Sequence, residues 1–223
     1  MSPASHHDFT LLGVALQARA SGALWHEGSR LLVVSDLHLG RSERLARRGG
    51  ALLPPYETRE TLRRLDDEIE ATQATRVICL GDSFDDLAAV DSLGEAERLW
   101  LARLMAGRDW VWIEGNHDAG SVEIGGTHRA EVTLGPLVLR HIPAPGARGE
   151  VAGHFHPKVV LARHSHRAFL IDAQRAILPA FGAYTGGMRP DDPALAGLMA
   201  GDAIGVLCGA RAVPVPLAPL CRR

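Results

Sequence analysis

The chain has 223 residues, of which 46% are hydrophobic and 22% are charged, as is usual for a soluble globular protein. Its length predicts a single domain over residues 1–223, and no apolar stretch approaches the ~20 residues that a membrane-spanning helix needs. The net charge of −2 gives no overall reason to expect nucleic acid binding, although a local basic patch could provide one.

The first half of the chain alternates predicted strands and helices. Two short strands are expected over residues 9–16 and 23–27, around a turn at Ser21 and Gly22. The predicted order then continues with a strand at 31–34, a helix at 56–72, a strand at 76–80, a helix at 93–106 and a strand at 110–113. The last three strands are continuous apolar runs, which are typical of strands covered on both faces, and this alternation predicts a mostly parallel sheet.

The second half has a different pattern, in which short apolar runs are separated by glycine and proline. These runs lie at 130–134, 137–142, 151–153, 158–163, 168–171, 177–181, 203–207 and 212–215. They predict mainly antiparallel sheet. The two halves together predict an α/β (α+β) fold, with a two-layer mixed β-sandwich flanked by helices.

Five short polar clusters each follow an apolar run, where a predicted strand ends. The clusters are Asp36-Leu37-His38, Gly81-Asp82, Gly115-Asn116-His117-Asp118, His141 and Gly153-His154-Phe155-His156. The carboxyl ends of parallel strands meet at one edge of a sheet, where ligands bind. Strand alternation would place Asp36 and His38 on one side, and the two oxygens of Asp82 could bridge two ions. The clusters therefore predict a dinuclear metal centre, although His141 could instead be a buried structural histidine.

The order of these clusters resembles the pattern of the calcineurin-like metallophosphoesterases, which is DxH, GD, GNH(D/E), H and GHxH. The resemblance extends from Leu31 to Pro157 and implies a β-sandwich with flanking helices. It implies a first metal ion bound by Asp36, His38 and His156, a bridging Asp82, and a second metal ion bound by Asn116, His141 and His154. It also implies that His117 is a general acid and that Asp118 orients it.

The expected chemistry is hydrolysis of a phosphate ester. Two ions roughly 3.5–4 Å apart lower the pKa of a shared water, so that a bridging hydroxide can attack phosphorus. His117 would then protonate the leaving group, and Arg41 could neutralise charge on the phosphate. Mixed oxygen and imidazole ligands suit Mn²⁺, Fe²⁺ or Zn²⁺, and we favour Mn²⁺ because no cysteine is among the ligands.

Three further segments resemble one bacterial branch of that superfamily, the ligase-associated DNA damage response endonucleases. They are Ser35-Asp36-Leu37-His38-Leu39-Gly40-Arg41, Leu53-Pro54-Pro55 and the stretch from Leu178 to Gly187. The resemblance implies a nuclease that acts on DNA in repair, in association with a DNA ligase, an exonuclease and a helicase. Asp85 stands where many relatives have histidine, and His164-Ser165-His166 is also atypical, so the substrate preference of the branch does not transfer directly.

Two other functions remain open at this stage. The same centre could serve a phosphomonoesterase or a phosphodiesterase of small molecules such as cyclic nucleotides. The absence of an obvious cap domain favours an open site, which a DNA enzyme needs. A binding module without activity, as in the retromer subunit that shares this fold, ranks last because the ligands and His117 are intact.

Several residues near the clusters have two possible interpretations. The four arginines between Arg41 and Arg48 could follow a phosphate backbone or form a solvated loop. Residues 179–187 could form a substrate wall or a tight corner, and Tyr184 there could stack on a base. We expect Asp85 to be a solvated loop residue or a helix cap, rather than a partner of a ligand, and His164 and His166 to be surface residues.

The cysteines and the N-terminus predict a cytoplasmic protein. The three cysteines form no CxxC motif, and Cys79 lies inside an apolar run, so we expect it to be a buried free thiol. The first residues lack the basic and apolar regions of a secretory signal.

Overall fold

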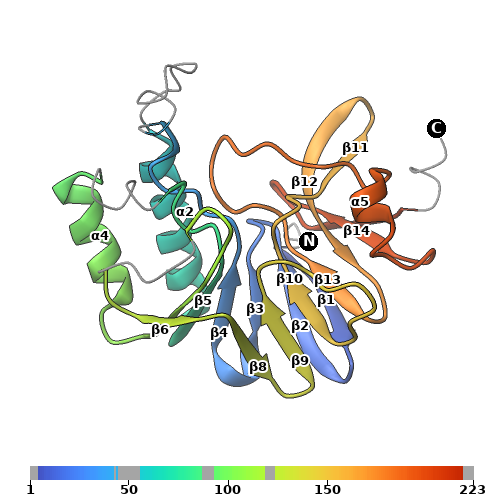
Figure 1. The fold of residues 1–223 in the computed structure, drawn as a ribbon, viewed down its shortest axis with the longest axis horizontal. Helices are drawn as coiled ribbons and strands as arrows, with labels where there is room; N and C mark the ends of the chain where they lie inside the picture. The colour runs from blue at the N-terminus through green and yellow to red at the C-terminus, as the bar shows by residue number, and fades with distance from the viewer. Residues whose placement is uncertain (1–4, 43, 45–55, 87–92, 119–123, 218–223) are drawn as a thin grey trace.

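Two mixed β-sheets pack face to face in the computed structural model, and helices lie outside them (Figure 1). The structure describes residues 5–42, 44, 56–86, 93–118 and 124–217. The predicted fold class, an α/β sandwich flanked by helices, is confirmed. Within the described residues, no helix is both long enough and apolar enough to cross a membrane.

The first sheet has the strand order β1-β2-β3-β4-β5-β6-β7. Its strands are β1 (His6–Leu11), β2 (Val14–Arg19), β3 (Leu24–His26), β4 (Leu31–Val34), β5 (Arg76–Leu80), β6 (Asp109–Ile113) and β7 (Thr127–Arg129). Strands β4 to β7 are parallel to one another, as the alternating pattern predicts, and β1 to β4 are antiparallel. The crossovers contain α2 (Glu57–Thr72) and α4 (Glu95–Met105), close to the expected helices.

The second sheet has the order β15-β14-β12-β13-β10-β9-β8, and β11 pairs with β12. Its strands are β8 (Glu131–Leu134), β9 (Leu137–Arg140), β10 (Glu150–Ala152), β11 (Lys158–Leu161), β12 (His164–Ile171), β13 (Arg175–Ile177), β14 (Ile204–Leu207) and β15 (Val213–Pro216). Most pairs are antiparallel, as expected. Strand β10 differs, because it is parallel to both of its neighbours, β9 and β13. The short helix α5 (Pro193–Ala196) covers part of the outer face.

Residues of β4 alternate between two hydrophobic clusters. Leu31 and Val33 face the second sheet, in a cluster that includes Phe169 of β12. Leu32 and Val34 face the opposite way and pack in the cluster that contains α2 and α4. This burial on both faces explains why β4 is a continuous apolar run. It also holds the end of β4 next to β5, its parallel neighbour.

The N-terminal segment differs from the prediction of one strand over residues 9–16. It forms the hairpin of β1 and β2, whose register pairs Leu11 with Val14. The two residues between them, Leu12 and Gly13, have φ values of 45° and 85°. Two-residue hairpin turns need positive φ at both positions, where asparagine or glycine is usual. Because Leu12 is apolar, the turn is hidden within an apparently continuous strand.

Candidate metal centre

The parallel register of the first sheet brings three of the polar clusters together. Val34 of β4 pairs with Cys79 of β5, and Leu80 of β5 pairs with Ile113 of β6, so these strands end at the same edge. The clusters that contain Asp36, Asp82 and Asn116 follow these three strands directly. The loops after β9 and β10 contribute the histidines of the second half.

Six of the predicted ligands form two groups, in each of which the ligand atoms lie within 4.8 Å of one another. The groups are Asp36, His38 and His156, and Asp82, His141 and His154. The seventh predicted ligand, Asn116, has its Oδ1 atom 3.0 Å from His141 Nε2. The structure thus brings all seven predicted ligands together, and their roles as metal ligands stay a prediction.

Five of these residues have left-handed backbone conformations, with φ between 47° and 71°. They are Asp36, His38, Asp82, His154 and His156. Such conformations cost about 1–3 kcal/mol each and cluster at functional sites. The expected alternation along an extended strand is therefore wrong for Asp36 and His38, because β4 ends at Val34 and a tight turn directs these side chains. Backbone hydrogen bonds hold this turn in place; for example, His38 N donates to Asp82 O at 2.9 Å.

The arrangement of donor atoms fits a bound cation. Asp36 is fully buried, and its Oδ1 atom accepts no hydrogen bond from the described residues. His156 Nε2 lies 3.0 Å from that oxygen and 3.4 Å from His38 Nε2. His154 Nδ1 and His141 Nε2 face each other at 3.3 Å in the second group. Buried lone pairs that point at one another are costly unless a cation or a proton satisfies them.

The electrostatics of the two groups keep the carboxylates ionised at neutral pH. Burial by itself raises the pKa of Asp82, but His141 and the backbone N–H of His117 outweigh burial, so the pKa falls below its usual value. Burial also raises the pKa of Asp36, and His156 and His141 reverse that effect. For His154, burial and the neighbouring His141 both lower the pKa, which favours the neutral imidazole that binds metals.

Asp85 holds the His38 ring in place, which corrects the expectation of a solvated loop residue or helix cap. Its side chain is fully buried, and its Oδ1 atom lies 2.8 Å from His38 Nδ1. Arg41 Nη1 lies 3.6 Å from the same oxygen, and Arg44 forms an ion pair with the other oxygen. A carboxylate at Nδ1 fixes the tautomer that leaves Nε2 available for a metal ion.

His117 and Asp118 also differ from expectation. His117 Nδ1 lies 3.0 Å from the backbone carbonyl oxygen of Asp85, which is the group positioned to orient the ring. The Asp118 carboxylate instead accepts hydrogen bonds from the backbone N–H groups of Asp82, Ser83, Phe84 and Gly115. Asp118 therefore ties the loop after β5 to the loop after β6, and it acts on the site through the position of Asp82.

Comparisons with known proteins identify the family. Residues 29–156 match the family model for the calcineurin-like phosphoesterases. The chain belongs to this family. Its structure is similar to the crystal structure of the Pseudomonas putida nuclease MPE, with a TM-score of 0.75 and 30% sequence identity over 94% of this chain and 100% of that one. No curated protein matches the chain. The protein is a metal-dependent phosphoesterase.

The segment 179–187 packs against the turn that contains Asp36. Phe181 N donates to Ser35 O at 2.7 Å, and Gly182 N donates to Asp36 O at 3.1 Å. A Cβ atom on Gly182 would lie 2.2 Å from Leu37 O, so only glycine allows this approach. The segment is therefore a packed corner where it meets Asp36, while Tyr184, which we expect to stack on a base, is 56% exposed.

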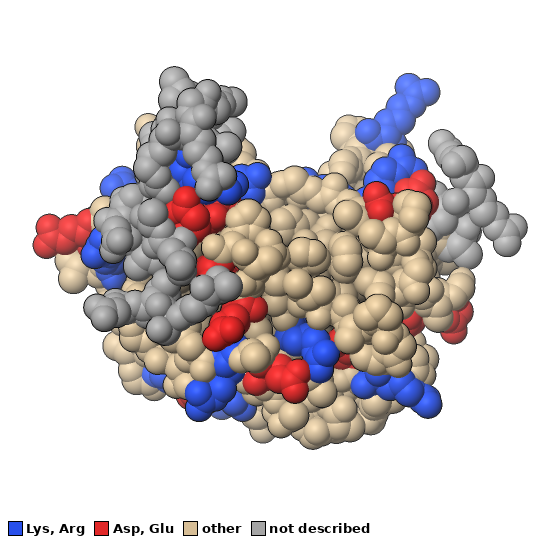
Figure 2. Space-filling view, in the orientation of Figure 1, with Lys and Arg blue, Asp and Glu red and all other residues tan. Residues whose placement is uncertain are grey.

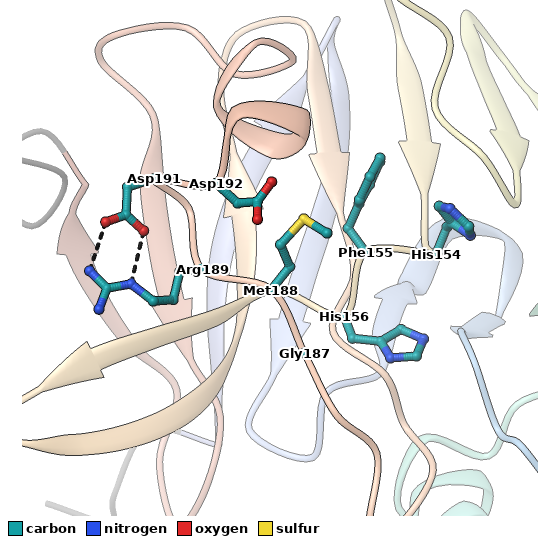
Figure 3. Close-up of a pocket in the computed structure, with 8 residues that line it drawn as sticks. All are labelled: His154, Phe155, His156, Gly187, Met188, Arg189, Asp191 and Asp192. Atoms are coloured by element: carbon teal, nitrogen blue, oxygen red, sulfur yellow. Dashed lines mark hydrogen bonds and ion pairs between the residues drawn. The ribbon is translucent and has the colours of Figure 1, made fainter.

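Two pockets border the candidate metal centre. One has a volume of about 720 Å³ and includes His154 and His156 in its lining (Figure 3). The other has a volume of about 370 Å³ and includes Asn116 and His141. The first pocket shares one residue with each group, and the second shares His141 with the group of Asp82, so both pockets open beside the candidate ligands.

Proposed function

We propose that this protein is a phosphodiesterase that cleaves DNA with the help of two divalent metal ions. The observation that carries the proposal is that two groups of candidate ligands lie at one edge of the first sheet. They are the group of Asp36, His38 and His156 and the group of Asp82, His141 and His154. We assign Asp36, His38 and His156 to the first ion, Asp82 to both ions, and Asn116, His141 and His154 to the second. When bound, the ions would lower the pKa of a water molecule and neutralise phosphate charge.

His117 is the proposed general acid. Its Nδ1 atom faces the carbonyl oxygen of Asp85 at 3.0 Å, so that nitrogen is a donor and Nε2 is left to deliver a proton. The ring lies 5.3 Å from the His38 ring, centroid to centroid, next to the first metal group. Proton transfer to a leaving alkoxide of DNA typically contributes roughly 10²–10⁴-fold.

The surroundings of the centre support a polymeric substrate. Arg41 and Arg44 are held beside the centre by Asp85, where they can face phosphate groups. The β11–β12 hairpin projects from the body of the molecule (Figure 2), and Arg163 in the hairpin turn is exposed. The similar Pseudomonas putida protein is described as a nuclease. Arg47 and Arg48, which we also expect to approach a phosphate backbone, lie outside the described residues.

The finer parts of the proposal rest on the sequence resemblance and on the donor chemistry. Mn²⁺ is the favoured metal ion, because oxygen and imidazole ligands suit it, and Fe²⁺ or Zn²⁺ would fit the same donors. A role in DNA repair, alongside a DNA ligase, an exonuclease and a helicase, follows from the resemblance to the ligase-associated branch.

A substrate comparison tests the proposal. We expect the Mn²⁺-loaded protein to hydrolyse bis-nitrophenyl phosphate and DNA, single- or double-stranded, much faster than nitrophenyl phosphate or cyclic nucleotides. A preference for the monoester would assign the centre to a phosphomonoesterase. A preference for cyclic nucleotides over DNA would assign it to small-molecule signalling or turnover.

A further inference from the structure

The larger pocket beside the centre contains residues that the metal sites do not use. Its lining consists of His154, Phe155, His156, Gly187, Met188, Arg189, Asp191 and Asp192. Figure 3 shows the side chains of Phe155, Met188 and Asp192 standing next to one another, with His156 below them. The volume, about 720 Å³, falls in the range of small-molecule sites and far exceeds that of a phosphate group.

Phe155 and Met188 provide a fixed apolar surface in this pocket. The Phe155 ring packs edge-on against the His154 ring, with centroids 5.0 Å apart and planes at 74°. Met188 N lies within hydrogen-bonding distance of the carbonyl oxygens of Phe155 and His156, at 3.3 and 3.2 Å. The backbone of Met188 is thus paired with the segment that contains His154, Phe155 and His156. Nucleobases stack on aromatic side chains, and a thioether sulfur makes favourable contacts with aromatic rings.

The charges in the pocket disfavour a second phosphate group. Arg189 forms a two-pronged ion pair with Asp191, at 2.9 Å and 2.7 Å. Asp192 adds a further carboxylate, whose Oδ1 atom accepts a hydrogen bond from the backbone N–H of Ala194 at 3.0 Å. The carboxylates therefore outnumber the guanidinium group in this pocket, whereas Arg41 and Arg44 lie on the Asp85 side of the centre. An uncharged part of the substrate fits the pocket better than its phosphate backbone.

We propose that this pocket binds the nucleoside attached to the phosphate under attack, with its base against Phe155 and Met188. The second oxygen of Asp192 accepts a hydrogen bond from a base N–H or a sugar hydroxyl. The inference rests on the proposed phosphodiesterase function. The pocket would then make the enzyme hydrolyse nucleotide diesters in preference to diesters that have no base.

Three diesters with the same leaving group isolate this contribution. They are a thymidine nitrophenyl phosphate (tested as both the 5′ and the 3′ ester), the corresponding deoxyribose ester without a base, and methyl nitrophenyl phosphate. We expect kcat/KM in Mn²⁺ to rise about tenfold or more from the ester without a base to the thymidine ester, in line with measured stacking contributions. Because the methyl ester has no nucleoside, its kcat/KM measures hydrolysis at the metal centre without a contribution from the pocket.

Variants assign that gain to the pocket. Phe155→Leu keeps an apolar side chain and removes the ring, and should reduce the ratio of thymidine ester to ester without a base to about twofold. Asp192→Asn keeps a residue that can cap α5 and should lower the thymidine-to-methyl ratio about threefold to tenfold. Asp202→Asn, at an exposed position outside the pocket, should leave both ratios unchanged. If Phe155→Leu proves inactive on every ester, Met188→Ala tests the same surface.

The outcomes separate this inference from the proposed function. Hydrolysis of the methyl ester with equal kcat/KM for all three diesters would overturn the nucleoside pocket and leave the phosphodiesterase intact. Unchanged ratios in the Phe155 and Asp192 variants would do the same. Failure to hydrolyse any of the three diesters would overturn both.

Discussion

Asp85 offers a sharp test of how the first metal site is organised. The substitution Asp85→Asn keeps the shape of the side chain but removes a charge that is fully buried and lies 2.8 Å from His38 Nδ1. The carboxylate is ionised at neutral pH, because His38, Arg44 and Arg41 outweigh burial, which alone would raise the pKa of Asp85. The variant therefore weakens the orientation of His38 and places an amide beside two guanidinium groups.

The expected size of the effect follows from this contact. A hydrogen bond to a charged group contributes about 1.5–3 kcal/mol, and removing such a partner of a metal-bound histidine typically costs about 10–100-fold in metal affinity. The two ranges agree, because each factor of ten in affinity corresponds to about 1.4 kcal/mol. We expect Asp85→Asn to weaken the binding of Mn²⁺ to the first site by this factor.

Isothermal titration of Mn²⁺ into chelator-treated protein measures this effect. Asp67→Asn, at an exposed position on α2, is the matched control and should bind Mn²⁺ like the wild type. Activity of Asp85→Asn should recover in part when Mn²⁺ is raised well above the new dissociation constant. Wild-type affinity in a folded Asp85→Asn variant would show that Asp85 does not support a metal ligand.

Three further substitutions test the centre and its support. Asp82→Asn should lose bound metal and activity together in elemental analysis and turnover assays, and full turnover would exclude Asp82 as the bridge. His117→Asn should retain metal but slow DNA cleavage more than the hydrolysis of nitrophenyl esters, whose leaving group needs no proton, while an equal loss on both would argue against the acid role. Gly182→Ala should destabilise the fold by about 1–3 kcal/mol, because its Cβ would lie 2.2 Å from Leu37 O, whereas Gly186→Ala, with open space around it, should leave the unfolding midpoint within error.

The parallel strands and the proximity of the candidate ligands after them were predictable from the sequence because each signal is local. Strands β4, β5 and β6 are covered on both faces, so each is a short apolar run, and the clusters at Asp36, Asp82 and Asn116 follow these runs directly. Parallel pairing then requires the three clusters to share one edge. The proximity of His38 to His156 was predictable only from the family pattern, because it depends on how the second sheet packs against the first.

The partners of these ligands were not predictable in the same way. Asp85 is one of several acidic residues after β5, and only the folded loop shows that it is buried against His38, Arg41 and Arg44. Asp118 follows His117 directly, which favoured a contact between the two, yet its carboxylate binds backbone N–H groups of the neighbouring loop. Burial of a polar side chain depends on distant segments, and the sequence near that residue does not contain this information.

Anomalous diffraction from crystals of the Mn²⁺-loaded protein shows directly whether two ions occupy this centre. We expect two manganese peaks roughly 3.5–4 Å apart. One should lie among Asp36, His38 and His156, the other among Asn116, His141 and His154, with Asp82 contacting both. A single peak, or peaks away from these side chains, in a crystal whose protein cleaves phosphodiesters would contradict the dinuclear centre.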